Sequence, residues 1–272
     1  MLDRQLLRGI PRIRRARGFR LYDMQGRRYL DLFRDGALLG HRDSGSLTAM
    51  KSALSQGLAA ALPSVWEKRL LTALARSFPR HPEIRLYVSK DRALDAACRC
   101  LGGGPLVIHD PALDGDAAGR VPAGFWRPFL PPDEGARVLL PLMPVKVGEA
   151  PAPACFAGEV PRTVPVSDII PAFILAGAVR GFASLSRSID TGCPLSNPDL
   201  DKALDAAPGW ARVGPYVRAV FPEAEYPKVH AEFLHAGVLL HPGYPGPSVL
   251  PGDCSPGETR LLAGLFTRIP GG

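Results

Sequence analysis

The amino-acid sequence predicts an α/β protein with a parallel or mixed sheet, completed by a smaller α+β region at the C-terminal end. Apolar segments with the pattern of strands alternate with helical segments in residues 84–142, and this order is typical of parallel sheets. The second half of the chain combines short strands with capped helices. Hydrophobic residues make up 46% and charged residues 22% of the 272 residues, as expected for a folded globular chain.

The first 50 residues are strongly basic. They contain eleven Arg and five Asp, while the net charge of the whole chain is +7. A basic arm is typical of proteins that bind nucleic acid or an anionic surface. However, no nucleic-acid motif accompanies the arginines, and residues 20–31 predict two short strands joined by a turn at residues 23–26. We therefore expect this segment to dock on a partner subunit or on the C-terminal half, and not to bind nucleic acid.

Two helices are expected next. The first follows Ser44 or Ser46; the second begins after Ser64, which can form a capping box with Glu67, and ends near Phe78. The first helix carries an apolar stripe that we expect to pack either against a second subunit or within its own subunit: Leu47, Met50, Leu54 and Leu58.

The central part of the chain supplies the strand, helix, strand order. Residues 84–88 alternate as a strand, and Ser89 can cap the helix that follows, which the glycines at 102–104 end. Residues 106–108 and 138–142 have the uniformly apolar character of buried parallel strands.

The second half begins with the Pro- and Ala-rich residues 149–165, which are expected to form a loop. A long helix is expected from Ser167 to about Ile189. The remaining expected elements are a helix capped by Asn197 and ending near Leu204, a strand at 212–221, a helix at 227–236, a strand at 238–240 and a helix opened by a capping box of Ser255 and Glu258.

Membrane, secreted and zinc-binding classes are not expected. The longest apolar run, residues 169–179, contains Pro171 and is shorter than the roughly 20 residues that span a bilayer. The first residues lead into arginines without the apolar region of a signal peptide. Five Cys residues without a CxxC pair argue against a disulfide framework or a zinc site. We therefore expect a cytoplasmic protein without a metal.

Short motifs occur in a recognisable order at both ends of the chain. They are residues 17–23, Gly26, residues 29–32, Gly36 and residues 39–41 at one end, and residues 233–242 with Ser255, Glu258 and Leu262 at the other. In this order they resemble the class III aminotransferases, with glutamate-1-semialdehyde aminomutase nearest in style. The resemblance implies fold type I, with a large domain that binds pyridoxal phosphate (PLP) and a smaller domain made from both chain ends.

The stretch that resembles the family's cofactor-phosphate site is altered. In the family, a Ser-Gly-Thr-Glu-Ala turn opens a helix whose amides and hydroxyl hold the phosphate of PLP; the similar stretch here is Ser89-Lys90-Asp91-Arg92. Lys90 replaces the Gly that lets the backbone approach the phosphate, and the Asp91 carboxylate repels it. Lys90 and Arg92 offset part of that repulsion. The resemblance therefore implies a weak remnant of the phosphate site at Ser89, Lys90, Asp91 and Arg92.

The family's catalytic core is not recognisable in this shorter chain. Residues 111–115 offer no aromatic ring to stack on the cofactor, and neither the family's Asp-Glu-Val strand nor its Schiff-base lysine is found. The chain passes from the strand at 138–142 through a loop to a helix that resembles the one after that lysine. Among the six lysines, Lys146 lies near a plausible sheet edge, and the others are expected at the surface: Lys51, Lys68, Lys90, Lys202 and Lys228.

These departures predict a degenerate aminotransferase relative that has lost the PLP–lysine core. We expect a non-catalytic pseudoenzyme without a resident cofactor, which forms a homodimer or binds a full-length aminotransferase paralogue. One alternative is a PLP-dependent aminotransferase or aminomutase that uses Lys146 or a lysine of a neighbouring subunit. A second alternative is an anion or nucleic-acid binder that uses the basic arm.

Three regions are expected along the chain. They are an N-terminal arm and strand pair at residues 1–50, a shortened large α/β domain at residues 51–165 and a small α+β domain at residues 166–272.

Overall fold

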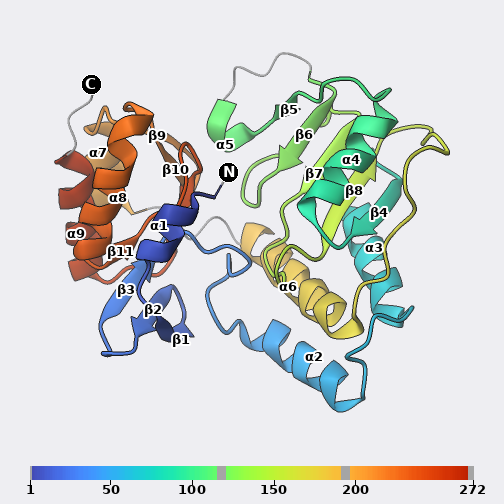
Figure 1. Ribbon diagram of the computed structural model, residues 1–272, viewed down its shortest axis with the longest axis horizontal. Coiled ribbons are helices and arrows are strands. Elements are labelled where there is room, and N and C mark those ends of the chain that lie inside the picture. The colour runs from blue at the N-terminus through green and yellow to red at the C-terminus, as the bar shows by residue number, and fades with distance from the viewer. Residues whose placement is uncertain (1, 115–120, 191–196, 269–272) are drawn as a thin grey trace. The chain divides into compact units, whose positions relative to one another are not determined.

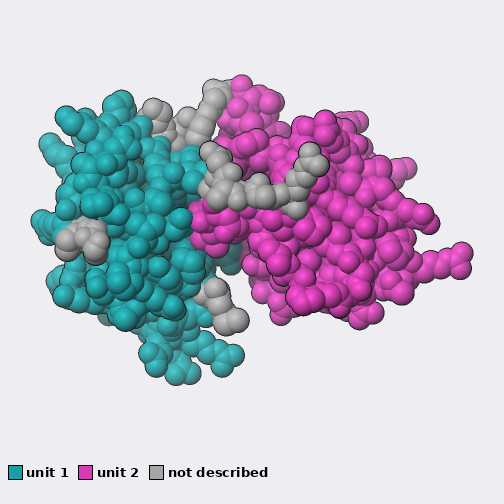
Figure 2. Space-filling view, turned by 90° about the horizontal axis from the view of Figure 1, so that it is seen from above, with its two compact units in different colours: residues 1–35, 191–272 teal, residues 36–190 magenta. Residues whose placement is uncertain are grey.

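A computed structural model describes residues 2–114, 121–190 and 197–268. The chain divides into two compact units, shown in Figure 2: unit 1, residues 1–35 and 191–272, and unit 2, residues 36–190. The sequence placed boundaries after residues 50 and 165 instead. Residues 36–50 and 166–190 belong with unit 2 because helix α2 (Ser44–Ser55) packs along helix α6 (Ala172–Asp190).

Unit 2 contains a mixed sheet of five strands in the order β4-β8-β7-β6-β5. The strands are β4 (Glu83–Tyr87), β5 (Ile108–His109), β6 (Ala123–Trp126), β7 (Val138–Pro141) and β8 (Ala152–Phe156). Strands β5, β6 and β7 are parallel, and β8 is antiparallel to both β7 and β4. Strands β4 to β7 therefore run in one direction, and their carboxyl ends share one edge of the sheet. This confirms the predicted α/β class.

Helices cover both faces of this sheet (Figure 1). Helix α4 (Lys90–Cys100) packs on one face, and α3 (Val65–Ser77) and α6 pack on the other. The residues of β7 show the alternation that this requires: Val138 and Leu140 belong to the core under α4, and Leu139 belongs to the core under α3 and α6. Short helix α5 (Pro111–Asp114) follows β5.

Unit 1 joins both ends of the chain in one sheet of order β1-β2-β3-β11. The strands are β1 (Ile13–Arg17), β2 (Arg20–Asp23), β3 (Arg28–Asp31) and β11 (Val238–Leu239). The predicted strand pair is confirmed as β2 and β3, and β3 pairs with β11 in parallel. The N-terminal segment, up to residue 35, thus docks on the C-terminal half of the chain.

A second sheet and the remaining helices complete unit 1 around an aromatic core. In this core the ring of Trp210 contacts those of Phe221 and Phe266, with centroid distances of 5.5 and 5.0 Å. The remaining elements are β9 (Trp210–Val213), β10 (Tyr216–Ala219), β12 (Ser248–Val249), α1 (Arg4–Gly9), α7 (Pro198–Asp205), α8 (Tyr226–His235), α9 (Pro256–Thr267) and a short 3-10 helix (Glu223–Glu225).

The loop predicted at residues 149–165 is wrong, because strand β8 lies within it. The prolines of this stretch suggested irregular structure. Pro153, however, lies opposite Leu86 of β4 at a position where no backbone N–H is needed to bond β4, so proline is tolerated there. The Leu86 amide instead donates to the Ser167 hydroxyl at 3.1 Å. Ser167 therefore does not open the long helix, which begins at Ala172.

Other element predictions needed smaller corrections. The strand expected at 212–221 is the hairpin of β9 and β10, which turns at Gly214 with a φ of 56°. Strand β6 was not expected. Ser64 precedes α3 as predicted but its side chain makes no cap hydrogen bond. The stripe predicted on α2 is partly wrong: Leu54 is 45% exposed and the fully buried residues are Ser46, Ala49 and Ala53, whereas Met50 and Leu58 do pack within the subunit.

Within the residues that the structure describes, no helix is both long and apolar enough to cross a membrane.

Candidate functional site at the carboxyl edge of the unit 2 sheet

Five charged residues come together where the parallel strands of unit 2 end. Lys90 begins the helix after β4, Asp110 directly follows β5, and Arg127 directly follows β6. Lys146 and Glu149 belong to the segment between β7 and β8. Arg127 bonds Asp110, and Glu149 bonds the Lys90 amide. The charges of Asp110, Arg127, Lys146 and Glu149 all act on the pKa of the Lys90 ammonium. We refer to Lys90, Asp110, Arg127, Lys146 and Glu149 as the edge cluster. Open α/β sheets bind ligands at this edge.

The start of α4 carries the four residues predicted as a phosphate-site remnant. The Ser89 hydroxyl accepts a hydrogen bond from the Arg92 amide at 3.3 Å, so Ser89 caps the helix. The Arg92 guanidinium donates two hydrogen bonds to Asp168, at 2.7 and 2.6 Å, and is thus engaged outside the edge cluster. Asp91 is exposed in the first turn. Of the four, only Lys90 joins the edge cluster.

A carboxylate of the chain itself occupies the α4 N-terminus. The Lys90 amide donates to Glu149 Oε2 at 3.0 Å. The positive end of the helix dipole favours an anion at this position. Glu149 lies at the tip of a tight turn in which Val147 and Ala150 bond each other through their backbones and Gly148 has a φ of 61°.

Asp110 and Arg127 form a buried, two-bonded ion pair. The Arg127 guanidinium donates to Oδ1 of Asp110 at 2.5 Å and to Oδ2 at 2.6 Å, and the two side chains are only 14% and 10% exposed. Oδ1 of Asp110 also accepts from the Ala112 amide at 3.1 Å. Both carboxylate oxygens are therefore already hydrogen-bonded, and the guanidinium is held rigidly at the end of β6.

The ammonium of Lys90 lies 4.5 Å from the centroid of the Phe125 ring. Desolvation is the main cause that lowers the pKa of Lys90, and repulsion by Arg127 and Lys146 adds to it. Attraction to the carboxylates of Asp110 and Glu149 raises the pKa of Lys90. The edge cluster thus carries three basic and two acidic side chains, and the positive charges of Arg127 and Lys146 repel that of Lys90.

Lys146 is fixed through its backbone. Val145 forms an antiparallel bridge with Ala37, and the Leu38 amide donates to the Pro144 carbonyl at 3.1 Å. A Cβ on Gly36, whose φ is 70°, would lie 2.9 Å from Cγ of Lys146. Only glycine allows this close approach, which holds the start of the Lys146 side chain in place.

These residues do not fit the PLP cofactor that the fold implies. The Lys90 amide already bonds a carboxylate, and the aspartate at the end of β5 uses both oxygens for Arg127. The helix after β5 spans Pro111–Asp114, and none of its residues is aromatic.

Sequence reasoning identified Lys90 and Lys146 but missed Glu149 and Arg127 as site residues. Asp110 was not among the predicted site residues either. Arg127 was missed because strand β6 was missed, and Glu149 because its surroundings were taken as a loop. The usable signal was Phe125-Trp126-Arg127, where a polar residue directly follows an aromatic strand-like run.

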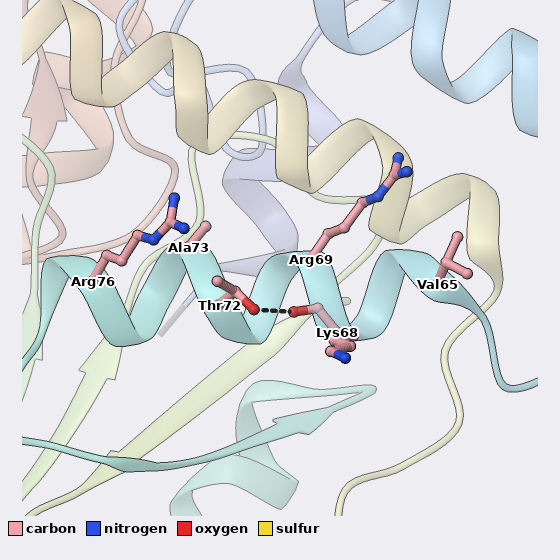
Figure 3. A pocket seen from close by; sticks show the side chains of 6 residues that line it. All are labelled: Val65, Lys68, Arg69, Thr72, Ala73 and Arg76. Carbon is pink, nitrogen blue, oxygen red and sulfur yellow. Dashed lines mark hydrogen bonds between the residues drawn. The ribbon is translucent and has the colours of Figure 1, made fainter.

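Two hollows elsewhere offer less chemistry. One, shown in Figure 3, lies along α3 and is lined by Val65, Lys68, Arg69, Thr72, Ala73 and Arg76. A groove in unit 1 between α1, β3 and α8 includes the buried His230, whose pKa burial lowers. Across residues 2–114, 121–190 and 197–268, no group of three or more His, Cys, Asp or Glu side chains could hold a metal ion.

Comparison by sequence finds relatives of two kinds. An uncharacterized protein from Treponema pallidum (strain Nichols) is 29% identical over an alignment 296 positions long, which covers 91% of this chain and 91% of that protein. An uncharacterized protein from Borreliella burgdorferi is 25% identical and covers 95% of this chain and 91% of its own length. A glutamate-1-semialdehyde 2,1-aminomutase from Syntrophus aciditrophicus is 33% identical over 98 residues, 35% of this chain and 23% of that enzyme. No family model matches the chain.

Comparison by structure finds aminotransferases over nearly the whole chain. An ornithine aminotransferase from Plasmodium yoelii has a TM-score of 0.70 at 13% identity and covers 95% of this chain and 92% of its own. A glutamate-1-semialdehyde aminomutase from Pseudomonas aeruginosa PAO1 has a TM-score of 0.65 at 17% identity, with coverages of 95% and 87%. A transaminase with PLP bound has a TM-score of 0.68 at 13% identity. The chain therefore has the fold of the fold type I PLP-dependent transferases.

Proposed function

We propose that this protein is a non-catalytic member of the aminotransferase fold, which has lost the chemistry of PLP bound to a lysine and acts by binding a partner chain. The observation that carries the proposal is the Asp110–Arg127 pair. In the family that the sequence resembles, an aspartate of the core strand pairs with the pyridine nitrogen of PLP. No counterpart of that aspartate is recognised in this sequence, and the aspartate that follows β5 at this edge, Asp110, is bound through both oxygens by a buried guanidinium. Breaking a buried ion pair costs about 3–5 kcal/mol, so this carboxylate is poorly placed for a new partner.

Glu149 supports the same conclusion. Its carboxylate holds the α4 amide at the position where the family's helix holds the cofactor phosphate. A phosphate dianion approaching this helix would meet a negative charge that is already in place.

The most direct test is an absorbance spectrum of the purified protein with an equimolar amount of PLP. Because we propose that no lysine forms an imine with the cofactor, the spectrum should equal the sum of the separate spectra. A new visible band that survives gel filtration would contradict the proposal.

A second candidate function is favoured by one observation: Lys146 belongs to the edge cluster, close enough to lower the pKa of Lys90. A PLP-dependent aminotransferase or aminomutase would use Lys146 to hold the cofactor. In that case the new band would appear with the wild type and disappear with Lys146→Ala, while Lys68→Ala, in the exposed hollow of α3, would keep it.

The partner we propose is a second copy of the chain or a full-length aminotransferase paralogue. Three exposed apolar side chains, from the last turn of α2 to the first residue of α3, support a contact surface there. Leu54, Leu62 and Val65 are 45%, 59% and 65% exposed. Figure 3 shows Val65 at the end of the hollow along α3, which continues the same surface.

A further inference from the structure

The groove between α1, β3 and α8 lies within unit 1 and has a volume of about 410 Å³. It holds fewer charged groups than the edge cluster, but one of its residues, His230, carries a buried polar atom without a partner. We propose that this groove binds a small aromatic carboxylate that carries a hydroxyl group. The inference goes beyond the proposed function, because it concerns unit 1 and involves no lysine and no residue of the edge cluster.

His230 asks for a hydrogen-bond donor. It is 2% exposed, and within the described parts of the chain its Nε2 has no hydrogen-bond partner. Burial is the main cause that lowers the pKa of His230, whereas a hydrogen bond with the Leu240 backbone raises it. A backbone hydrogen bond raises the pKa of a histidine when the ring donates it, so the other ring nitrogen is the donor and Nε2 of the neutral ring is an acceptor. A hydroxyl group on a ligand would satisfy this acceptor.

Arg27 supplies a cation for an anionic group. Its guanidinium donates to the His235 carbonyl and lies 5.2 Å from the centroid of the Tyr29 ring, and these two contacts hold it beside the groove. No carboxylate side chain of the described residues pairs with it. A guanidinium has five N–H donors in a planar arrangement that matches a carboxylate, so Arg27 retains donors for one.

The other walls of the groove are apolar and partly flat. Tyr29 is 5% exposed, and its hydroxyl donates to Asp23 Oδ2 at 3.1 Å, so its ring is the part left for a ligand. Pro11 and Pro227 add two rigid rings, and Leu234 adds an aliphatic side chain. Such walls suit an aromatic ring, and the volume is in the range of small-molecule sites.

Helix α1 is the side of the groove that moves most readily. It has six residues, none of them buried, and the Asp3 amide before it donates to the Pro242 carbonyl at 2.8 Å. An element with so little burial opens at low cost in free energy. Because Nε2 of His230 is buried, a ligand reaches it when α1 shifts outward, and the bound ligand then packs between α1 and α8.

The test titrates the full chain with three probes and follows the probes by NMR. Para-hydroxyphenylacetate has the ring, the hydroxyl and the carboxylate; phenylacetate lacks the hydroxyl; tyramine has an ammonium group in place of the carboxylate. We expect para-hydroxyphenylacetate to bind about fivefold more tightly than phenylacetate, because one hydrogen bond is lost, and tyramine not to bind. No binding of para-hydroxyphenylacetate, or equal binding of all three probes, would overturn the proposal.

Variants locate the site. Arg27→Gln should weaken the binding of para-hydroxyphenylacetate about fivefold, whereas Arg8→Gln, an exposed arginine of α1 that does not line the groove, should bind it like wild type. His230→Phe should bind para-hydroxyphenylacetate no better than phenylacetate. If His230→Phe does not fold, the two arginine variants and the probe series on wild type still decide the outcome. Equal weakening by Arg27→Gln and Arg8→Gln would contradict the assigned site.

Hydrogen exchange of wild type supplies a readout that needs no variant. Binding of para-hydroxyphenylacetate should slow the exchange of the α1 amides, because the ligand ties α1 to α8. A probe that binds while exchange in α1 and α8 stays unchanged would place the ligand elsewhere and overturn the proposal.

Discussion

Glu258 links the two ends of the chain through a nearly buried carboxylate. It accepts from Arg20 Nε at 2.8 Å and from Nη2 at 2.6 Å, and it completes the predicted capping box by accepting from the Ser255 amide at 2.8 Å. Hydrogen bonds from Arg20 are the main cause that lowers the pKa of Glu258 to about 2. One side chain thus ties strand β2 to the start of α9.

This arrangement predicts acid-sensitive stability. Because the pKa of Glu258 is lowered from 4.5 to about 2 on folding, its stabilising effect is complete above pH 4.5 and is lost as the pH falls toward 2. Glu258→Gln should lower the free energy of unfolding by about 3 kcal/mol at pH 7. Urea unfolding at pH 7 and pH 3 checks this. The difference between variant and wild type should shrink at pH 3; an equal difference at both values would show that the charge is not responsible.

His230 adds a second acid-sensitive group in unit 1. It is buried in α8, and burial lowers its pKa from 6.5. The unfolded chain therefore binds a proton more readily than the folded one, and stability should fall as the pH drops below about 6.5. His230→Gln should remove this part of the pH dependence. Thermal unfolding at pH 7.5 and 5.5 measures it, and a variant that loses as much stability as wild type between these values would rule it out.

At the scale of elements, α2 and α6 pack closely because α6 presents glycines. A Cβ on Gly181 would lie 2.4 Å from Cγ2 of Val145, and one on Gly177 would lie 2.6 Å from Cγ of Met50. Met50, predicted on the apolar stripe of α2, thus packs inside its own subunit. The contact also positions Val145, the neighbour of Lys146.

Gly181→Ala should therefore destabilise unit 2 by about 1–3 kcal/mol, because the added methyl group forces neighbouring atoms apart. Gly45→Ala is the matched control in α2, since its Cβ would meet nothing closer than 3.7 Å and Ala favours the helix. Calorimetric melting compares them. A Gly181→Ala protein as stable as wild type would mean that α6 and Val145 are less closely packed than described.

The sequence predicted elements with strong local signals and failed where tertiary context decided. Ser89, Asn197 and Ser255 were identified as helix caps because capping is a local interaction. Strand β8 was missed because the pairing of Pro153 opposite Leu86, which makes proline acceptable, is not visible in sequence. The same limit applied to the candidate site. Lys146 was predicted near a sheet edge, but Glu149 belongs to the site only because it accepts a hydrogen bond from the amide of Lys90, which is distant in the sequence.

At the scale of the whole molecule, we predict a homodimer that uses the exposed apolar residues before and at the start of α3. Light scattering at micromolar concentrations should give the mass of a dimer for wild type. Leu62→Arg with Val65→Glu should give a monomer, because charges would replace 59% and 65% exposed apolar side chains. Val166→Glu, at a position that is 78% exposed elsewhere in unit 2, should leave the dimer intact. A wild-type monomer mass that persists as concentration rises would refute the prediction.

The central claim, that no lysine of this chain holds PLP, is tested most directly by borohydride reduction in the presence of equimolar PLP, followed by peptide mass mapping. Borohydride converts any imine into a stable amine at the lysine that formed it. The account predicts no stoichiometric adduct on any of the six lysines, and in particular none on Lys146 or Lys90. A stoichiometric adduct on one lysine, lost when that residue is replaced by Ala, would contradict it.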